Sequence, residues 1–381
     1  MRVIVVSDKF APHAGGTARV WTEYCRCWPA EGLHVIAPKL PDCNAFDAAQ
    51  PYRITRIPYP DVPKLRMPIL HFRMLASLIA ACRRERPHIV HLAQLLENGL
   101  HGPMIRQRFG VPYVLHTYGE EVNALLKRPR TLAKARAALQ QSSGVTTISQ
   151  FTKGLLQTQL TCTQPITMAR PAVRTDYFVP GDGGAIRSRL GIGSSPLLLT
   201  VARLMRRKGH DRVIEAMPCI LKSYPDARYV IAGTGSEATR LQRLANELGV
   251  GHAVIFLGRV PDDEILALYQ AADVFVHPNR ELPSGDVEGF GIVFLEANAC
   301  GVPVIGGNSG GTPDAIQHGV TGYLVDPNDV DEIADRILTL LGDPALRKRM
   351  GQAGREWAKK FTWEAAAQTV WDLSCKVARK E

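Results

Sequence analysis

The sequence of 381 residues lacks the features of membrane-spanning proteins, of secreted proteins and of proteins stabilised by a structural metal ion. No apolar run approaches the roughly 20 residues that cross a bilayer, and residues 1–7 form a strand-like run rather than the apolar core of a signal peptide. The eight cysteines form no Cys-x-x-Cys pair and no Cys/His group with zinc spacing. We therefore expect a cytoplasmic protein with reduced thiols.

A dinucleotide-binding fingerprint is missing as well. Residues 8–16 end in Gly15-Gly16 and lack the Gly-x-Gly-x-x-Gly spacing that cradles a dinucleotide pyrophosphate. This disfavours a nicotinamide-dependent dehydrogenase. The glycine pair still permits a ligand to approach the backbone closely, because glycine carries no Cβ.

Acidic residues are scarce in the first half of the chain. Residues 1–180 contain 23 Lys/Arg but only 11 Asp/Glu, whereas residues 181–381 contain 23 and 25, so the net charge of +10 arises entirely in the first half. Such a surface attracts an anionic membrane, a nucleic acid or an anionic substrate, although solubility alone also favours it. A non-catalytic binder of anionic lipid or nucleic acid is therefore an alternative to weigh.

What the sequence does contain is a regular alternation of short apolar runs and helical segments, which predicts an α/β protein with mostly parallel sheets. The predicted strands are 1–7, 34–37, 54–57, 89–92, 113–116, 145–149, 197–202, 229–232, 253–256, 274–277, 304–305 and 322–324. The predicted helices include 68–86, 131–141, 211–223, 237–248, 262–271, 293–300 and 329–341.

A turn-rich stretch, residues 180–184, divides this alternation into two series. We predict two doubly wound, Rossmann-like domains over residues 1–180 and 181–355. Residues 356–381 are predicted to be helical and to pack back towards the first domain. Ligands of open α/β sheets bind outside the carboxyl ends of the strands, so we expect a site in a cleft between the two domains.

The strongest motif is the segment from Glu288 to Glu296, which follows a predicted strand and opens a predicted helix. Gly289 and Gly291 allow close backbone approach, and the free N–H groups of residues 291–293 at the positive end of the helix dipole suit a diphosphate. Each glutamate is able to accept hydrogen bonds from the hydroxyls of a different sugar. The alternative, two surface glutamates near a helix start, leaves the intervening glycines unexplained.

A second motif, residues 203–209, follows another buried run and carries Arg203 and Lys208. Arginine grips phosphate oxygens as a fork and lysine acts as a point charge, so the pair is suited to a diphosphate that leaves during a reaction. A solvated basic loop is the alternative.

These two motifs resemble glycosyltransferase family 4, with its Glu-x7-Glu motif at Glu288 and Glu296 and its Arg/Lys pair at Arg203 and Lys208. Within that family, residues 285–296 and 309–315 are similar to the phosphatidylinositol mannosyltransferases of bacteria. The resemblance extends over essentially the whole chain and is more specific in the second half. It implies the GT-B fold, which has two Rossmann-like domains facing across a cleft, and a retaining, metal-independent transfer of a hexose.

The resemblance also implies a role for particular residues. Arg203 and Lys208 would bind the donor diphosphate, Glu288 would bind the donor sugar with the backbone of Gly289, Phe290 and Gly291, and Glu296 would bind the ribose. Ile292 and Val293 would also belong to the donor-binding site. Arg259 and Val260 would lie at the base. In the first domain, Gly15 and Gly16 would approach the donor phosphate, and His116 would contact the donor sugar. Considered by itself, a histidine at a strand end is more often a core or capping residue.

By resemblance, the expected donor is GDP-mannose, with a UDP-sugar as the alternative, and the expected acceptor is a lipid-linked or saccharide precursor. We expect no cofactor, no metal ion and no nucleic-acid partner. The one Asp-x-Asp string, 329–331, opens a predicted helix, where capping explains its acidic residues.

Two basic segments, Lys64–Arg86 and Lys127–Arg130, belong to the basic half of the chain. Arginines alternate with apolar residues in the first segment, so the two segments together are candidates for docking on the anionic inner face of the cytoplasmic membrane. A core helix with a solvated basic face is the alternative.

Overall fold

The computed structural model describes residues 1–13, 15–60, 65–126 and 129–379, except for the side chains of Glu120 and Ala124. It divides into two compact units: unit 1 comprises residues 1–171 and 363–381, and unit 2 comprises residues 172–362. The sequence predicted a division at residue 180 and a separate tail from residue 356. In the structure the chain leaves unit 1 earlier, and it returns for its last helix only.

Unit 1 is built on a seven-stranded sheet in the order β3-β2-β1-β4-β5-β6-β7. Every pair of neighbouring strands is parallel. The strands are β1 (Val3–Val6), β2 (Leu33–Pro38), β3 (Arg53–Ile57), β4 (Ile89–Leu92), β5 (Tyr113–Thr117), β6 (Gly144–Thr147) and β7 (Ile166–Met168). All four residues of β1 are buried, as expected for a central strand of a parallel sheet with both faces covered.

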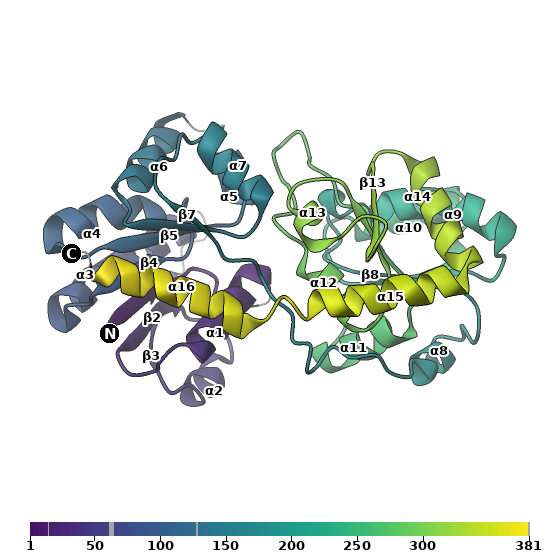
Figure 1. Ribbon diagram of the computed structural model, residues 1–381, viewed down its shortest axis with the longest axis horizontal. Coiled ribbons are helices and arrows are strands. Elements are labelled where there is room, and N and C mark those ends of the chain that lie inside the picture. The colour runs from purple at the N-terminus through teal and green to yellow at the C-terminus, as the bar shows by residue number, and fades with distance from the viewer. Residues whose placement is uncertain (14, 61–64, 127–128, 380–381) are drawn as a thin grey trace. The chain divides into compact units, whose positions relative to one another are not determined.

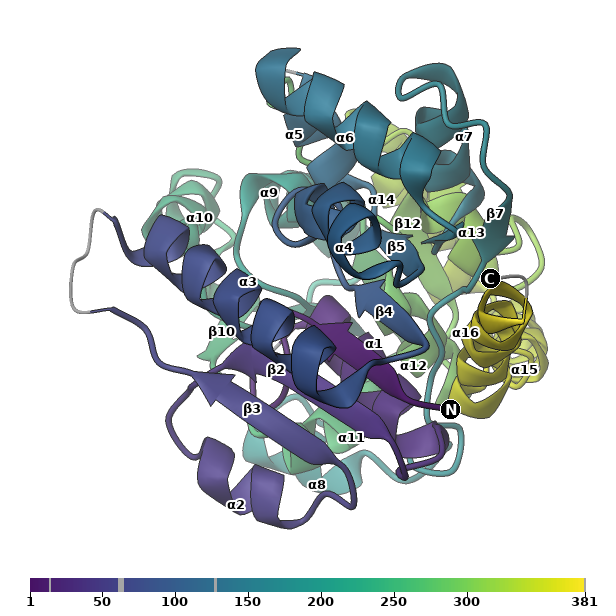
Figure 2. The same cartoon turned by 90° about the vertical axis from the view of Figure 1, so that its left-hand side faces the viewer.

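Helices cover this sheet, and one of them, α16, is formed by the last segment of the chain (Figures 1 and 2). They are α1 (Gly16–Cys27), α2 (Cys43–Ala48), α3 (Arg66–Glu85), α4 (Gly102–Phe109), α5 (Glu120–Leu126), α6 (Pro129–Gln141), α7 (Gln150–Thr158) and α16 (Trp363–Ala378). Helix α3 packs on β2 and β3, while α16 packs on α1 and on β4, β6 and β7. Of the predicted basic residues, Lys64, Lys127 and Arg128 lie outside the described residues.

Unit 2 repeats the design with six parallel strands in the order β10-β9-β8-β11-β12-β13. The strands are β8 (Leu197–Val201), β9 (Arg228–Ala232), β10 (Val254–Gly258), β11 (Val274–His277), β12 (Val304–Gly307) and β13 (Gly322–Val325). The helices are α8 (Gly184–Arg189), α9 (His210–Ser223), α10 (Ala238–Glu247), α11 (Asp262–Ala271), α12 (Ile292–Ala299), α13 (Thr312–Ala315), α14 (Val330–Gly342) and α15 (Pro344–Ala358).

Local signals in the sequence explain where two of these helices begin and end. The carboxylate of Asp329 accepts the N–H of Glu332 at 2.9 Å, so the Asp-x-Asp string caps α14, as predicted. Helix α12 ends at Ala299, and Gly301 follows with φ of 79°, the left-handed conformation in which glycine commonly terminates helices. Both predicted boundaries are confirmed to within one residue.

Candidate functional site

The best-formed polar cluster in unit 2 lies at the carboxyl ends of two neighbouring strands. Strand β8 leads through residues 202–209 into α9, and strand β11 leads through residues 278–291 into α12. Because β8 and β11 are adjacent in the parallel sheet, both loops emerge at the same edge. The two motifs singled out in the sequence are therefore neighbours in space.

Glu288 is the centre of this cluster. Its Oε2 accepts hydrogen bonds from Lys208 Nζ and from Arg207 Nη1, the latter at 2.7 Å. Arg207 also brings its Nε within 3.0 Å of Asp286 Oδ1. The side chains of Arg207, Lys208 and Glu288 are only 6%, 12% and 14% exposed, so these charges interact largely out of water. Oppositely charged groups in such surroundings attract far more strongly than on an open surface.

The charged groups of this cluster shift one another's pKa values. Burial alone would raise the pKa of Glu288, but Lys208 and then Arg207 reverse that effect and hold it well below its ordinary value. Burial lowers the pKa of Lys208, an effect that the Glu288 carboxylate opposes. Glu288 is consequently an anion at neutral pH, able to accept hydrogen bonds but poor as a proton donor.

Arg203 lies next to this cluster but remains exposed. Its positive charge acts on Lys208 and lowers the pKa of that amine, which places the two cations near each other. Within the described ranges, the guanidinium of Arg203 forms no ion pair. Arg203 is thus an exposed cation beside the paired Lys208 and Glu288, and it is available to bind an anion.

Helix α12 points its amino terminus at the same edge of the sheet. Gly291 precedes the helix with φ of 94°, and a Cβ there would collide with the ring of Phe294, so the turn requires glycine. The first turn contains no acidic residue, and Gly291 before it has no side chain that could cap the helix. The amide groups at this end are therefore available to an anion.

A second glycine loop fixes the backbone of Glu288. The N–H of Gly311 donates to the carbonyl of Glu288 at 2.9 Å. Gly310 has φ of 58° and lies so close to the same carbonyl that a Cβ would collide with it. The loop that the sequence singled out at residues 309–311 thus holds Glu288 in place.

Glu296 occupies a different environment from Glu288. It lies inside α12, is 5% exposed, and accepts a hydrogen bond from the Tyr269 hydroxyl at 3.0 Å. Its predicted contact with a ribose stays a prediction. Arg259 and Val260 follow β10, two strands away from β8 in the sheet, with Arg259 exposed.

The remaining predicted residues belong to unit 1. Gly15 and Gly16 stand at the start of α1 and are exposed; Gly15 has φ of 138°. His116, at the end of β5, is 2% exposed and packs edge-on against Trp21 with 4.5 Å between ring centres. Its predicted contact with a sugar stays a prediction, since both of its ring nitrogens are engaged within unit 1.

A buried chain of hydrogen bonds accounts for both nitrogens. The hydroxyl of Ser374 donates to the Val370 carbonyl, so its oxygen accepts from His91 Nε2 at 3.0 Å. His91 Nδ1 then accepts from His116 Nε2 at 2.9 Å, and His116 Nδ1 accepts from the Thr146 hydroxyl at 2.6 Å. This order makes both rings neutral. Burial accordingly lowers the pKa of His91 to about 3 and that of His116 well below its ordinary value.

The structure also brings forward residues that the sequence analysis passed over. Arg207 lies within the basic run at residues 203–209, but nothing in its spacing distinguishes it from Arg206. Asp211 receives both Nη atoms of Arg280 at 2.9 and 2.8 Å, and the N–H of Arg280 donates to the Arg207 carbonyl at 2.8 Å. These hydrogen bonds of Arg280 connect the loop after β11 to the loop after β8 and to the start of α9.

His277, the last residue of β11, is a further such residue. It is fully buried and its ring stacks on Phe294 with 5.4 Å between centres. Burial and then the charge of Lys208 hold its pKa well below the ordinary value, so it is neutral beside the cationic cluster.

Over the residues that the structure describes, no group of three or more His, Cys, Asp or Glu side chains has the arrangement of a metal site. A search of the same residues for a helix long and apolar enough to cross a membrane finds none.

Comparisons with known proteins identify the family. Residues 184–357 match the family described as "Glycosyl transferases group 1", and residues 14–177 match "Glycosyltransferase Family 4". A GDP-mannose-dependent α-(1-6)-phosphatidylinositol monomannoside mannosyltransferase of Mycolicibacterium smegmatis is 36% identical over 97% of both chains. A GDP-mannose-dependent monoacylated α-(1-6)-phosphatidylinositol monomannoside mannosyltransferase of Corynebacterium glutamicum is 31% identical over 98% of this chain and 97% of that protein.

Solved structures share the fold. A sucrose-phosphate synthase from Thermosynechococcus elongatus superposes with a TM-score of 0.84 at 23% identity over 100% of both chains. The Anabaena protein HepE, in complex with UDP and glucose, superposes with a TM-score of 0.81 at 18% identity over 98% of each chain. The two Rossmann-like units together with the two family matches identify a glycosyltransferase of the GT-B fold. The chain belongs to glycosyltransferase family 4.

Proposed function

We propose that this protein transfers a mannosyl group from GDP-mannose to a hydroxyl of a phosphatidylinositol mannoside, with retention of the anomeric configuration. The cluster of Arg203, Arg207 and Lys208 around Glu288 carries this proposal, because it combines cations for a diphosphate with a carboxylate for sugar hydroxyls. The names of the Mycolicibacterium and Corynebacterium relatives support this choice of donor and acceptor.

The donor diphosphate would bind between the cations and the start of α12. Arg207 and Lys208 pair with the two carboxylates of Asp286 and Glu288, and Arg203 beside Lys208 leaves a net positive charge. The amino terminus of α12 adds about half an elementary charge of the same sign. A leaving diphosphate gains negative charge as the glycosidic bond breaks, so these fixed charges stabilise the transition state more than the ground state.

Glu288 would accept hydrogen bonds from hydroxyls of the transferred sugar. A carboxylate held by Lys208 and Arg207 is a weak nucleophile, which disfavours attack on the anomeric carbon. We therefore propose attack on the face of the leaving group. The acceptor oxygen forms a bond to the anomeric carbon, the bond to the diphosphate oxygen breaks, and that diphosphate oxygen takes the acceptor's proton.

We also propose that the reaction needs neither a metal ion nor an organic cofactor. In many nucleotide-sugar enzymes a divalent cation neutralises the leaving diphosphate, whereas Arg203 and Lys208 would supply that charge here. Chelation with EDTA should then leave transfer unchanged.

Unit 1 would receive the acceptor and dock peripherally on an anionic membrane of the cytoplasmic side. At the start of α3, Leu65, Met67 and Phe72 are 53%, 43% and 70% exposed, and Arg66 and Arg73 belong to the same turns. Exposed apolar side chains beside arginines are typical of helices that lie in a membrane interface. A lipid acceptor would reach the protein at that surface.

The test is a transfer assay with purified chain, phosphatidylinositol monomannoside and radiolabelled donors, run with and without EDTA. We expect mannosyl transfer from GDP-mannose and at most weak transfer from UDP-glucose or UDP-GlcNAc. Efficient transfer from a UDP-sugar alone would replace the donor, and loss of activity in EDTA would refute independence from metal. If no sugar nucleotide supports transfer or raises the melting temperature, the whole proposal fails.

A further inference from the structure

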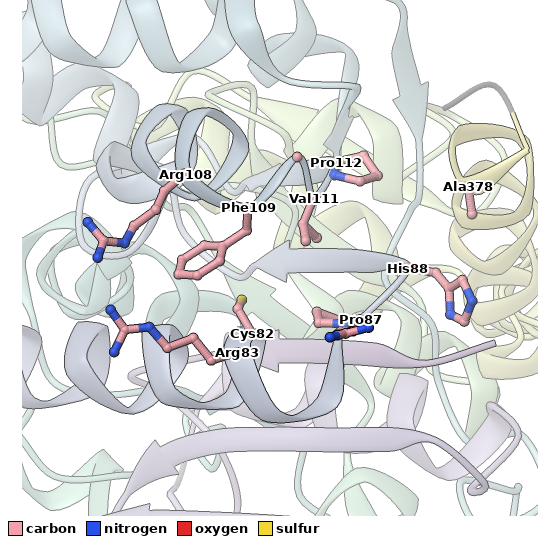
Figure 3. A pocket seen from close by; sticks show the side chains of 11 residues that line it. Cys82, Arg83, Pro87, His88, Arg108, Phe109, Val111, Pro112 and Ala378 are labelled. Carbon is pink, nitrogen blue, oxygen red and sulfur yellow. The ribbon is translucent and has the colours of Figure 1, made fainter.

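A cavity of about 510 Å³ opens in unit 1, away from the carboxyl ends of its strands. It is lined by Pro87 and His88, which precede β4, and by Val111 and Pro112, which precede β5. The ends of α3 and α4 and the end of α16 complete it (Figure 3). It therefore lies at the amino-terminal edge of the sheet, opposite to the edge where parallel α/β sheets place their active sites.

The cavity has an excess of positive charge. Arg83, Arg86 and Arg108 line it, and no residue of its described lining is acidic. The side chains of these three arginines form no ion pair within the described part of the chain, and all three residues are exposed. Like charges gathered without a counter-ion repel one another, and a bound anion would relieve that repulsion.

The nearest acidic residue in the sequence does not serve this cavity. Glu85 accepts hydrogen bonds from Arg84 at 2.6 Å, from Arg53 at 3.1 Å and from His34 at 2.9 Å. The hydrogen-bond partners of Glu85 therefore all lie outside the cavity lining. Arg83 and Arg84 are thus adjacent in sequence but differ in environment, because only Arg84 is neutralised.

Helix ends explain part of this charge but not all of it. Helices α3, α4 and α16 all end at the cavity, and the carboxyl end of a helix favours basic residues by carrying about half a negative charge. Three such ends amount to about one and a half negative charges, against three guanidinium groups. The net potential in the cavity is therefore positive.

The walls also offer contacts for an organic group. In Figure 3 the guanidinium groups of Arg83 and Arg108 lie on the same side of the cavity, with the Phe109 ring and the Cys82 sulfur near them. Burial raises the pKa of the Cys82 thiol to about 12, so this sulfur is an apolar wall rather than a nucleophile. His88 Nδ1 accepts the N–H of Arg2 at 2.9 Å, which leaves the proton of a neutral ring on Nε2 as a donor.

We propose that this cavity binds the phosphate of a small organic phosphate ester, either a soluble metabolite or the exposed headgroup of a glycerophospholipid. Arg83 and Arg108 would form the fork that grips the phosphate oxygens. The apolar wall of Phe109, Val111 and Pro112 would contact the organic part. The site is separate from the donor cluster of unit 2 and does not depend on it.

The experiment uses the full chain carrying Lys208→Gln, so that phosphate binding at the donor cluster is weakened. Glycerol 3-phosphate is titrated calorimetrically into this protein and into versions that also carry Arg83→Gln with Arg108→Gln, or Arg84→Gln as the matched control. We expect binding at one site, weakened about tenfold or more by the double substitution and unchanged by Arg84→Gln. A melting curve of each variant confirms that it is folded.

A second arm separates the two sources of phosphate. The same variants are floated with vesicles of phosphatidylglycerol or of phosphatidylcholine. Weaker flotation of the Arg83/Arg108 variant on phosphatidylglycerol, with no calorimetric binding of the soluble ester, assigns the site to a lipid headgroup. If the Arg83/Arg108 variant matches the Arg84 variant in both arms, the proposal is wrong. Sugar-nucleotide binding by an Arg83/Arg108 variant with Lys208 restored is expected to be normal, so the fate of the transferase proposal is measured separately.

Discussion

The two units share a strand order, except for the additional strand β7 of unit 1, but the buried ionisable groups near the carboxyl ends of their central strands differ in charge. At the carboxyl edge of unit 2, buried cations and anions are kept charged by pairing, as in Lys208 with Glu288 and Arg280 with Asp211. At the corresponding edge of unit 1, His91 and His116 are kept neutral by burial and by hydrogen bonds to each other and to hydroxyls. Most arginines of unit 1 are exposed, although Arg56 is largely buried and pairs with Asp47 at 2.6 Å.

This difference fits two tasks. A site that stabilises charge developing on a leaving group needs fixed charges that do not reorganise during the reaction, and paired ions in a rigid loop supply them. A surface that receives a bulky acceptor or a membrane benefits from exposed cations. Their side chains attract anionic groups from a distance and are free to change conformation. The comparison yields four predictions, given from the largest expected effect to the smallest.

Glu288→Gln should have the largest effect. It removes the anion that Arg207 and Lys208 share, so mannosyl transfer should fall by at least about 100-fold, and the uncompensated cations should lower stability by about 3–5 kcal/mol. Steady-state transfer rates and urea unfolding measure the two effects. The control is Glu247→Gln, an exposed glutamate of α10. Unchanged transfer by the Glu288 variant would remove this residue from the site.

Arg207→Gln should reduce kcat/KM by about 10- to 100-fold, because a charge-assisted hydrogen bond that orients Glu288 is lost. Since Arg207 acts through Glu288, we expect donor KM to rise together with a fall in kcat. Arg206→Gln is the matched control, because Arg206 is 64% exposed and only loosely paired with Glu237 at 3.6 Å. Equal kinetics for the two variants would show that Arg207 does not orient Glu288 for transfer.

His91→Gln should change how the stability of unit 1 depends on pH. The pKa of His91 is lowered from 6.5 to about 3 in the folded chain, so below pH 6.5 the unfolded state binds the extra proton and stability falls as the pH falls. Between pH 6.5 and 5 this residue accounts for a loss of about 2 kcal/mol, which glutamine would abolish while keeping a donor and an acceptor.

The measurement is urea unfolding followed by tryptophan fluorescence, since Trp28 lies 5.0 Å from His91 between ring centres. His252→Gln, at an exposed histidine of unit 2, is the control and should keep the full acid sensitivity. If the His91 and His252 variants lose stability alike on acidification, burial of His91 is not what destabilises unit 1 in acid.

Phe72→Ser should have the smallest effect and one confined to the membrane. Its ring is 70% exposed, so folding stability should change little, whereas flotation with anionic vesicles should weaken about tenfold. Val320→Ser, at an exposed apolar residue of unit 2, is the control and should float like the unmodified chain. Equal flotation of both variants, or none at low salt, would rule out docking through α3.

Periodicity alone located most of the strands of both sheets, because strands buried on both faces are continuous apolar runs. Strand β7 was missed, since Ile166–Met168 is a short edge strand whose residues are only partly buried. Helix α16 was correctly predicted to be helical and to return to the first domain, but its separation from α15 was not visible as a change of pattern.

For the site, the glycine spacing and the Arg/Lys run pointed to Arg203, Lys208 and Glu288. Arg207 could not be chosen over Arg206, because the two are adjacent in one basic run and differ only in the direction that the short helix at residues 206–208 gives them. The pairing of His91 with His116 was equally hidden, since it joins strands that are 25 residues apart in the chain.

The sequence by itself determined the class of fold, the approximate positions of the strands along the chain and the candidate residues for donor binding. These depend on local patterns: apolar runs, glycines at sharp turns, and the spacing of charges around a helix start. Only the tertiary structure decided which charges meet, which histidines are neutral and which arginines lack a partner. Those outcomes depend on contacts between distant segments and on exclusion of water, and a linear pattern encodes neither.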